Sequence, residues 1–324
     1  MNVGVRTFIV LFASFVLCHG GAWAQAWPSR PVSLVVPAAP GGGSDFLGRL
    51  FAEHLGEALG QAVVVDNVPG AANTIGHGAA AKAPPDGYRL LISDSGQAIF
   101  PALYPNLSFD PIAHLEQISL FIEVPVAITV AAKLNARTLA EFITLAKSTP
   151  GKLNVGTGGA GTANHIAGEI FKKITGTDFV HVPYKGAGPM MAALVGGQVD
   201  VIFATSTTAG LAGQHNAGAV RVLAVSGSKR LSSLPQVPSA PEVGLPDYMY
   251  SIWWGLAAPK GTPQPIIARL GDEVRKFLAR PNTQKRMAEY GATILGTSQA
   301  EAQARLLRDT KELSALVTQL GITQ

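Results

Sequence analysis

Two glycine-rich stretches have the residue types and the spacing to bind an anion. The first, Val35 to Asp45, contains Gly41-Gly42-Gly43, and the second, Asn154 to Thr162, reads Asn-Val-Gly-Thr-Gly-Gly-Ala-Gly-Thr. Each runs from an apolar strand pattern through a glycine turn into a helix pattern. The free N–H groups at the start of such a helix, together with its dipole, attract an anion without any side-chain chemistry. The two stretches therefore predict a pair of anion-binding loops.

The second loop also matches the G-x-G-x-x-G pattern of dinucleotide-binding proteins, at Gly156 to Gly161. That chemistry needs an acidic residue at the end of the next strand to hold the ribose. Here the next strand ends at Val182-Pro183-Tyr184, without an acid. A phosphate-binding Walker loop needs a lysine where Thr162 stands. We expect no cofactor, and an anion site is favoured over a turn that serves packing alone.

Other catalytic patterns are missing from the sequence. There is no G-x-S-x-G and no H-E-x-x-H, and the histidines are scattered singly. We interpret His54 and His77 as helix-surface residues and His181 as a strand residue. His165, in the first turn after Thr162, lies close to the proposed anion. No catalytic residue and no metal site is therefore predicted.

Four further side chains have alternative interpretations. Ser44 or Asp45 is expected to cap the first helix, and Asp45 can also fix the loop or orient a water or a ligand amine. Trp253 and Trp254 form an aromatic pair, interpreted either as hinge packing or as one wall of a cleft.

The elements that position the two loops repeat in the same order. A strand, a helix, a strand, a helix and a strand are expected at 32–36, 45–59, 62–65, 73–82 and 88–92, and again at 153–155, 162–174, 179–182, 189–195 and 199–203. Such alternation builds parallel sheets covered by helices, with ligands beyond the carboxyl ends of the strands. The fold class is therefore α/β, with two Rossmann-like lobes.

Two extended apolar segments, 118–130 and 251–259, are expected to cross between the lobes and form a hinge. Residues 25–125 with 248–324 then make the first lobe, and residues 126–247 make the second. Helices at 265–279 and 300–320 are expected to pack on the first lobe.

The composition fits a folded, exported protein. Of the 324 residues, 47% are hydrophobic and 14% charged, which argues against disorder. The net charge of +4 is dispersed, so no nucleic-acid partner is expected. Residues 1–24 read as a signal peptide, with a short apolar region and cleavage near Ala24 or Ala26. Removing it also removes Cys18, the only cysteine.

Several motifs together resemble one family, the substrate-binding proteins of tripartite tricarboxylate transporters, or Bug receptors. The resemblance covers essentially the whole mature chain. Its motifs are Trp27-Pro28-Ser29-Arg30-Pro31, Pro37 to Asp45, Leu59 to Val65, Pro85-Asp86-Gly87-Tyr88, Pro101-Ala102-Leu103-Tyr104, Pro150 to Asn154, Gly161-Thr162 with His165, His181 to Gly186, Gly196 to Val199, Trp254 to Pro259, and Gly261-Thr262-Pro263.

The resemblance implies a two-lobed periplasmic binding protein of the second topological type, a Venus flytrap with no enzymatic activity. It implies a monomer that binds a small carboxylate between the lobes and delivers it to membrane permease subunits. A periplasmic signalling adaptor is the alternative, and an α/β hydrolase or oxidoreductase is disfavoured. The implied ligand-binding residues are Ala39, Gly41, Gly42, Ser44, Asp45, Ser93, Ser95, Thr157, Gly159, Thr162, Ala163, Asn164, His165, Tyr184, Gly186 and Thr205.

One position departs from the family pattern. After the strand at 199–203 the family commonly has an aspartate, where this chain has Ala204. Because that acid can pair with a ligand amine, its loss predicts a preference for carboxylates without an amino group.

Overall fold

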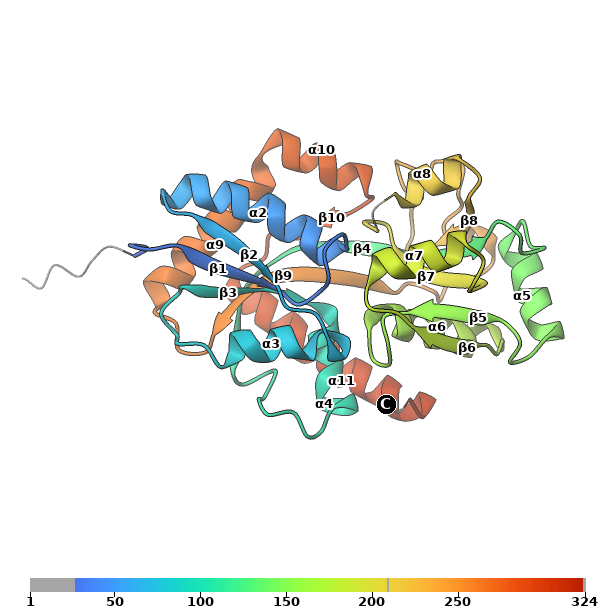
Figure 1. The fold of residues 1–324 in the computed structure, drawn as a ribbon, viewed down its shortest axis with the longest axis horizontal. Helices are drawn as coiled ribbons and strands as arrows, with labels where there is room; N and C mark the ends of the chain where they lie inside the picture. The colour runs from blue at the N-terminus through green and yellow to red at the C-terminus, as the bar shows by residue number, and fades with distance from the viewer. Residues whose placement is uncertain (1–26, 209, 323–324) are drawn as a thin grey trace, which may run out of the picture.

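A computed structural model describes residues 27–322, apart from residue 209. The predicted signal peptide and its cleavage site lie outside the described residues. The molecule is elongated, with two groups of strands and helices side by side along its length (Figure 1). Each group is an α/β lobe, as the alternating sequence pattern predicts.

The first lobe is built on three parallel strands, with β1 between β2 and β3. Helix α2 buries Leu47, Phe51 and Leu55 against this sheet and ends at Gly60, which has a left-handed φ of 63°. The elements of the repeated unit in this lobe are β1 (Val32–Val36), α2 (Gly43–Leu59), β2 (Val63–Asn67), α3 (Thr74–Ala81) and β3 (Arg89–Asp94).

The second lobe repeats this order. Strand β5 lies between β6 and β7, all parallel, and helix α6 ends at Gly176 in the left-handed conformation. The elements of this lobe are α5 (Leu139–Ser148), β5 (Asn154–Thr157), α6 (Ala163–Thr175), β6 (Val180–Pro183), α7 (Ala187–Val195), β7 (Val201–Thr205), α8 (Leu211–Asn216) and β8 (Val220–Val225).

One long strand, β4 (Leu115–Ala131), runs through both lobes. Its first part, as far as Pro125, pairs antiparallel with β9 (Ser251–Pro259), and its second part, from Val126, pairs with β7 and β8. Strand β9 in turn pairs with β3. Strand β4 thus changes its pairing partners between residues 125 and 126.

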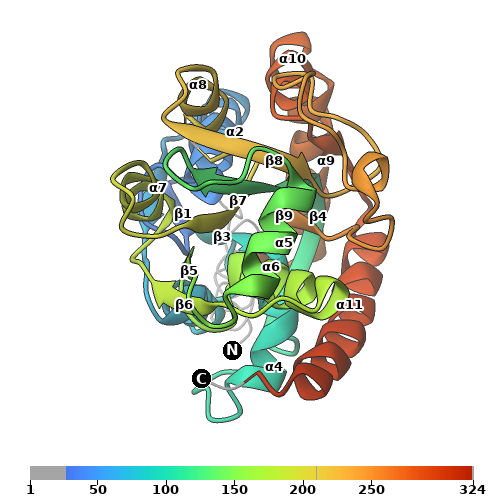
Figure 2. The ribbon, with the colours of Figure 1, turned by 90° about the vertical axis from the view of Figure 1, so that its right-hand side faces the viewer.

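The C-terminal helices lie on one side of the molecule, away from α7 and α8 (Figure 2). Helix α11 begins with a capping box of Ser298 and Glu301 and packs against β4 and the segment after β3. The remaining elements are the short helices η2 (Ala71–Asn73), η3 (Ser95–Ile99), α4 (Phe100–Leu103) and η4 (Pro241–Val243), the helices α9 (Gln264–Ala279), α10 (Pro281–Glu289) and α11 (Gln299–Leu320), and the short strand β10 (Thr293–Ile294). Within the described residues, no helix combines the length and the apolar character needed to span a membrane.

Two local predictions are wrong. Neither Ser44 nor Asp45 caps α2, because the helix begins two residues earlier than expected, at Gly43, and Gly42 occupies the cap position. His54 and His77 are not surface residues, since both are buried. The His54 Nε2 lies 3.1 Å from the Glu273 carbonyl oxygen of α9, and His77 packs edge-on against Phe100.

Candidate ligand-binding site

A cavity of about 610 Å³ lies where the carboxyl ends of the parallel strands of both lobes meet. The first lobe contributes the loop after β1 and the start of α2, and the second lobe contributes the start of α6 and the loop after β6. This is the arrangement that the paired glycine loops predict. The cavity therefore brings the N-termini of α2 and α6 to one place.

The starts of these two helices have unused hydrogen-bond donors. In α2 the first N–H with a partner inside the helix is that of Phe46, which donates to the Gly42 carbonyl. In α6 it is that of Ile166, which donates to the Thr162 carbonyl. Four backbone N–H groups of cavity-lining residues are therefore available to an anion, those of Gly43, Ser44, Ala163 and Asn164.

Asp45 holds the first loop rather than lining the cavity. Its carboxylate accepts hydrogen bonds from the Gly41 N–H at 3.0 Å, from the Arg49 Nε at 3.1 Å and from the Asn67 Nδ2 at 3.0 Å. Burial raises the pKa of this carboxyl group, but the hydrogen bonds from Arg49, Gly41 and Asn67 outweigh burial, so the pKa lies below its ordinary value. Of its proposed roles, fixing the loop is the one these contacts serve.

Uncharged groups hold the second loop. The Thr157 Oγ1 accepts from the Gly159 N–H at 3.2 Å, and the Thr162 hydroxyl donates to the Gly159 carbonyl at 2.8 Å. The Gly161 N–H donates to the His165 Nδ1 at 3.3 Å. Thr162 occupies the cap position of α6 as predicted, although its hydroxyl bonds the loop instead of a helix N–H.

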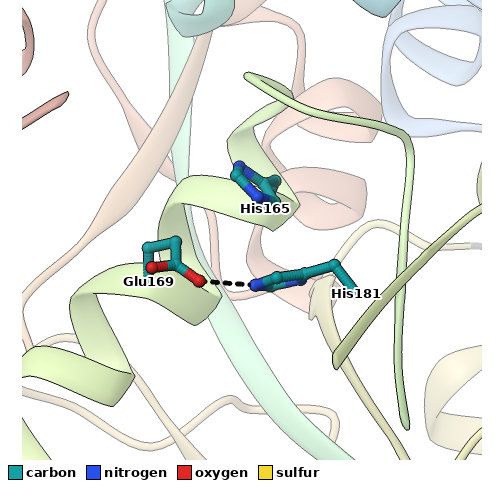
Figure 3. Close-up of side chains that lie close together, drawn as sticks. All are labelled: His165, Glu169 and His181. Carbon is teal, nitrogen blue, oxygen red and sulfur yellow. Dashed lines mark hydrogen bonds and ion pairs between the residues drawn. The ribbon is translucent and has the colours of Figure 1, made fainter. Parts of the chain in front are cut away.

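His165, which is buried, lies in a cluster with the partly buried Glu169 and His181 (Figure 3). The His181 Nε2 lies 2.6 Å from the Glu169 Oε1, and the Lys172 Nζ lies 3.3 Å from the same oxygen. Burial, with the nearby His181 and Lys172, lowers the pKa of His165 to about 4, and Glu169 only partly opposes this. His165 is therefore neutral near pH 7, which leaves Nδ1 free to accept from the loop.

The same three side chains have the ligand types of a zinc site, and their nitrogen and oxygen atoms lie within 4.8 Å of one another. Sequence reasoning missed the group because His181 reaches the other two only through the packing of β6 against α6. The Glu169 carboxylate is already paired with His181 and Lys172. We therefore describe the cluster as an ion-paired brace behind the second loop.

Nine of the predicted site residues line the cavity: Ala39, Gly42, Ser44, Thr162, Ala163, Asn164, Tyr184, Gly186 and Thr205. The other seven lie behind the cavity wall or to one side of it: Gly41, Asp45, Ser93, Ser95, Thr157, Gly159 and His165. Ser93, for example, donates to the Gln117 side chain at 2.8 Å in the interior.

Sequence reasoning missed one complete segment of the wall, the loop after β2 at residues 69–73, together with Asp94, Gly96, Ala187, Met190, Thr208 and Ile252. The segment 69–73 follows a parallel strand, so the rule that places ligands at carboxyl strand ends was the available signal. Ala71, Ala72 and Asn73 have φ angles of 43°, 50° and 75°. Strained backbone of this kind is typical of functional loops.

The two tryptophans have different roles. Trp254 lines the cavity, and its Nε1 donates to the Ser44 hydroxyl at 2.8 Å. Trp253 is fully buried and donates to Asp309 of α11. The cleft-wall interpretation therefore applies to Trp254 and the packing interpretation to Trp253.

Ala204 does not line the cavity. It is fully buried in a hydrophobic cluster with Leu211, and the next residue, Thr205, reaches the cavity instead. The prediction that a missing acid at this position excludes ligand amines therefore loses its structural basis.

Three glycines stand where the lobes approach each other. An added Cβ at Gly43 would lie 2.6 Å from the Thr207 Oγ1, one at Gly186 would lie 3.2 Å from the Ala39 Cβ, and one at Gly161 would lie 2.5 Å from the Leu103 Cδ1. Close to the last, the Tyr104 hydroxyl donates to the Ala160 carbonyl at 2.7 Å. Small side chains thus allow the two lobes to meet at the cavity rim.

Comparison with known proteins gives consistent results. A family model described as "Tripartite tricarboxylate transporter family receptor" matches residues 47–322. The "UPF0065 protein in the TAR-I ttuE-ttuC' intergenic region" of Agrobacterium vitis is 35% identical over 319 residues, covering 98% of this chain and 92% of that protein.

Two solved structures are similar along most of the chain. The periplasmic binding protein BugD is 34% identical with a TM-score of 0.86, covering 92% of this chain and 100% of that one. The R. palustris protein Rpa4515, solved with adipate, is 32% identical with a TM-score of 0.87, at the same two coverages.

Proposed function

Because the chain belongs to the tripartite tricarboxylate transporter receptor family, we propose that it is an exported receptor that binds a small carboxylate between its lobes and delivers it to membrane permease subunits. This is a family of binding proteins and not of enzymes. The predicted signal peptide supports export, and adipate, bound to the R. palustris relative, is a dicarboxylate.

One observation carries the proposal: the N-termini of α2 and α6 line one cavity with unused N–H donors. A carboxylate placed there gains hydrogen bonds and the favourable end of two helix dipoles. Such a site requires no metal, cofactor or nucleophile. Closure of the lobes about β4 and the segment before β9 would remove the bound acid from water.

A thermal-unfolding panel of mono-, di- and tricarboxylates and aromatic acids tests binding. An acid at 100 times its dissociation constant should stabilise the folded protein by about 2.7 kcal/mol. An unchanged unfolding temperature with every acid would contradict the carboxylate proposal. Delivery is tested separately, since deleting the gene should abolish cellular uptake of the acid that binds.

A further inference from the structure

Asp94, at the end of β3, is a buried acid that lines the cavity, and the residue is only 5% exposed. Its Oδ1 accepts from the Gly96 N–H at 2.8 Å, and its Oδ2 accepts from the Asn73 Nδ2 at 2.9 Å. Capping η3 through Gly96 requires only an oxygen acceptor, which serine or asparagine also supplies. The negative charge of Asp94 is therefore not explained by the cap.

No cation within the described part of the chain forms an ion pair with Asp94, whereas Asp45 in the same lobe is paired with Arg49. His77 is near enough to feel its charge, but burial lowers the pKa of His77, which is neutral near pH 7. Lys185, the one lysine that lines the cavity, belongs to the opposite lobe. An unpaired carboxylate becomes costly when a cleft closes over it and excludes water.

Trp254 lies beside this carboxylate. Asp94 and Trp254 are directly opposite each other on the antiparallel strands β3 and β9, so their side chains share one face of the sheet, and both line the cavity. A carboxylate beside an indole ring is a favourable environment for a cation, through charge pairing and the cation–π interaction. A neutral hydroxyl group would gain only a hydrogen bond.

The backbone next to Asp94 is shaped to support it. Ala71, Ala72 and Asn73 all have left-handed φ angles, and this turn places the Asn73 amide on the Asp94 carboxylate. The Thr74 hydroxyl secures the turn through the Ala71 carbonyl at 2.7 Å. Asp94 is thus held in one position at the cavity wall.

We propose that Asp94, together with Trp254, forms a subsite for a positively charged nitrogen of the ligand, so that the carboxylate ligand also bears a protonated amine. The ligand carboxylate would bind at the starts of α2 and α6, near Lys185. This inference rests on the proposed function and reverses the selectivity predicted from Ala204.

Matched acids that differ only in the amine test the inference: aspartate against succinate, glutamate against glutarate, and phenylalanine against 3-phenylpropionate, with malate as the hydroxyl analogue of succinate. In at least one pair the amino acid should bind at least about 10-fold tighter by calorimetry. Asp94→Asn should remove most of that preference by weakening the binding of the amino acid, and it should not weaken the binding of the acid without an amine, because that acid loses only a repulsion. The asparagine can still cap Gly96, so folding should be retained.

Asp66→Asn is the matched control, because Asp66 is a half-exposed acid of the same lobe, paired with Arg89 and absent from the cavity wall. It should leave every affinity unchanged. Three outcomes would overturn this inference while the carboxylate receptor stands. The acid without an amine could bind more tightly in every pair, or the hydroxyl of malate could raise the affinity as much as an amine does. Asp94→Asn could also weaken the binding of both members of a pair equally. Failure of all the acids to bind would overturn both.

Discussion

The loops before α2 and α6 have the same backbone design but are held in place by different chemistry. In the first lobe, the buried Asp45 carboxylate binds the Gly41 N–H and is itself paired with Arg49 and Asn67. In the second lobe, hydroxyl groups and a neutral imidazole bind the loop. The first loop thus depends on a charge that its own lobe supplies.

The second loop also touches the opposite lobe. The Tyr104 hydroxyl donates to the Ala160 carbonyl, and Leu103 lies against Gly161. The first loop also approaches the second lobe, at Ala39 and Gly43, but the hydrogen bonds that hold it come from its own lobe. The second loop, in contrast, accepts a hydrogen bond from the opposite lobe, so its position depends on how closely the lobes approach. We expect the first loop to set the strength of carboxylate binding and the second to couple binding to closure.

The largest effect is expected from Asp45→Ala. It leaves the Gly41 N–H, Arg49 and Asn67 without their shared acceptor, so we expect a loss of about 3 kcal/mol in the free energy of unfolding. Denaturant unfolding measures this loss, and calorimetry with a bound acid should show weakened affinity as well. Unchanged stability would mean that the hydrogen bonds of Asp45 do not hold the first loop.

The second prediction concerns pH. The pKa of His165 is lowered from 6.5 to about 4 in the folded protein, so between these values the unfolded chain binds a proton that the folded chain does not. The contribution of the neutral His165 side chain to the free energy of unfolding is complete above about pH 6.5 and is lost as the pH falls towards 4. The full shift corresponds to about 3 kcal/mol, and we expect about 2 after screening.

The groups that face His165 are Glu169 and Lys172 of its own helix and His181 of β6. His165→Gln keeps an acceptor for the Gly161 N–H but cannot titrate. The difference in unfolding free energy between the wild type and this variant, measured from pH 7 to pH 4, should therefore shrink as the pH falls. Parallel curves for the two proteins would exclude a titrating brace behind the second loop.

The third prediction tests contact between the lobes. Gly43→Ala adds a Cβ 2.6 Å from the Thr207 Oγ1 and from the Trp254 ring, at a backbone conformation that alanine tolerates. Overpacking of this kind should weaken ligand binding about 10-fold. Gly188→Ala is the matched control, because its Cβ would have no neighbour within 4 Å. Equal affinities for the two variants would count against closure at this contact.

The smallest effect is expected from Thr157→Val. It removes one neutral acceptor, that of the Gly159 N–H, and should cost about 1 kcal/mol in the free energy of unfolding. The same denaturant series used for Asp45→Ala provides the measurement. If Thr157→Val lowered the free energy of unfolding as much as Asp45→Ala does, the charged acceptor of the first loop would not differ in strength from the neutral acceptor of the second.

Much of the fold could be predicted from periodicity and turn residues. Strands β1 and β9 have the predicted bounds, and Gly60 and Gly176 end their helices as expected. These features depend on local sequence. The burial of His54 could not be predicted in this way, because α9 packs over it from a distant part of the chain.

Asp94 shows the same limit at the site. Ser93 and Ser95 were chosen from the resemblance, yet the residue between them is the one that lines the cavity. Successive side chains of a strand point to opposite faces, so Ser93 points inward to Gln117 while Asp94 points to the cleft. The family pattern identified the right strand end but not which of its faces meets the ligand.

The sequence by itself determined the order of strands and helices, the two glycine turns and the family, because each follows from local residue types. Only the tertiary structure decided which polar groups meet across the cavity. It separated Asp45 from Asp94, two buried acids in one lobe, by turning the first towards Asn67 of β2 and the second towards the cleft. That difference arises from packing between distant segments, which no local pattern records.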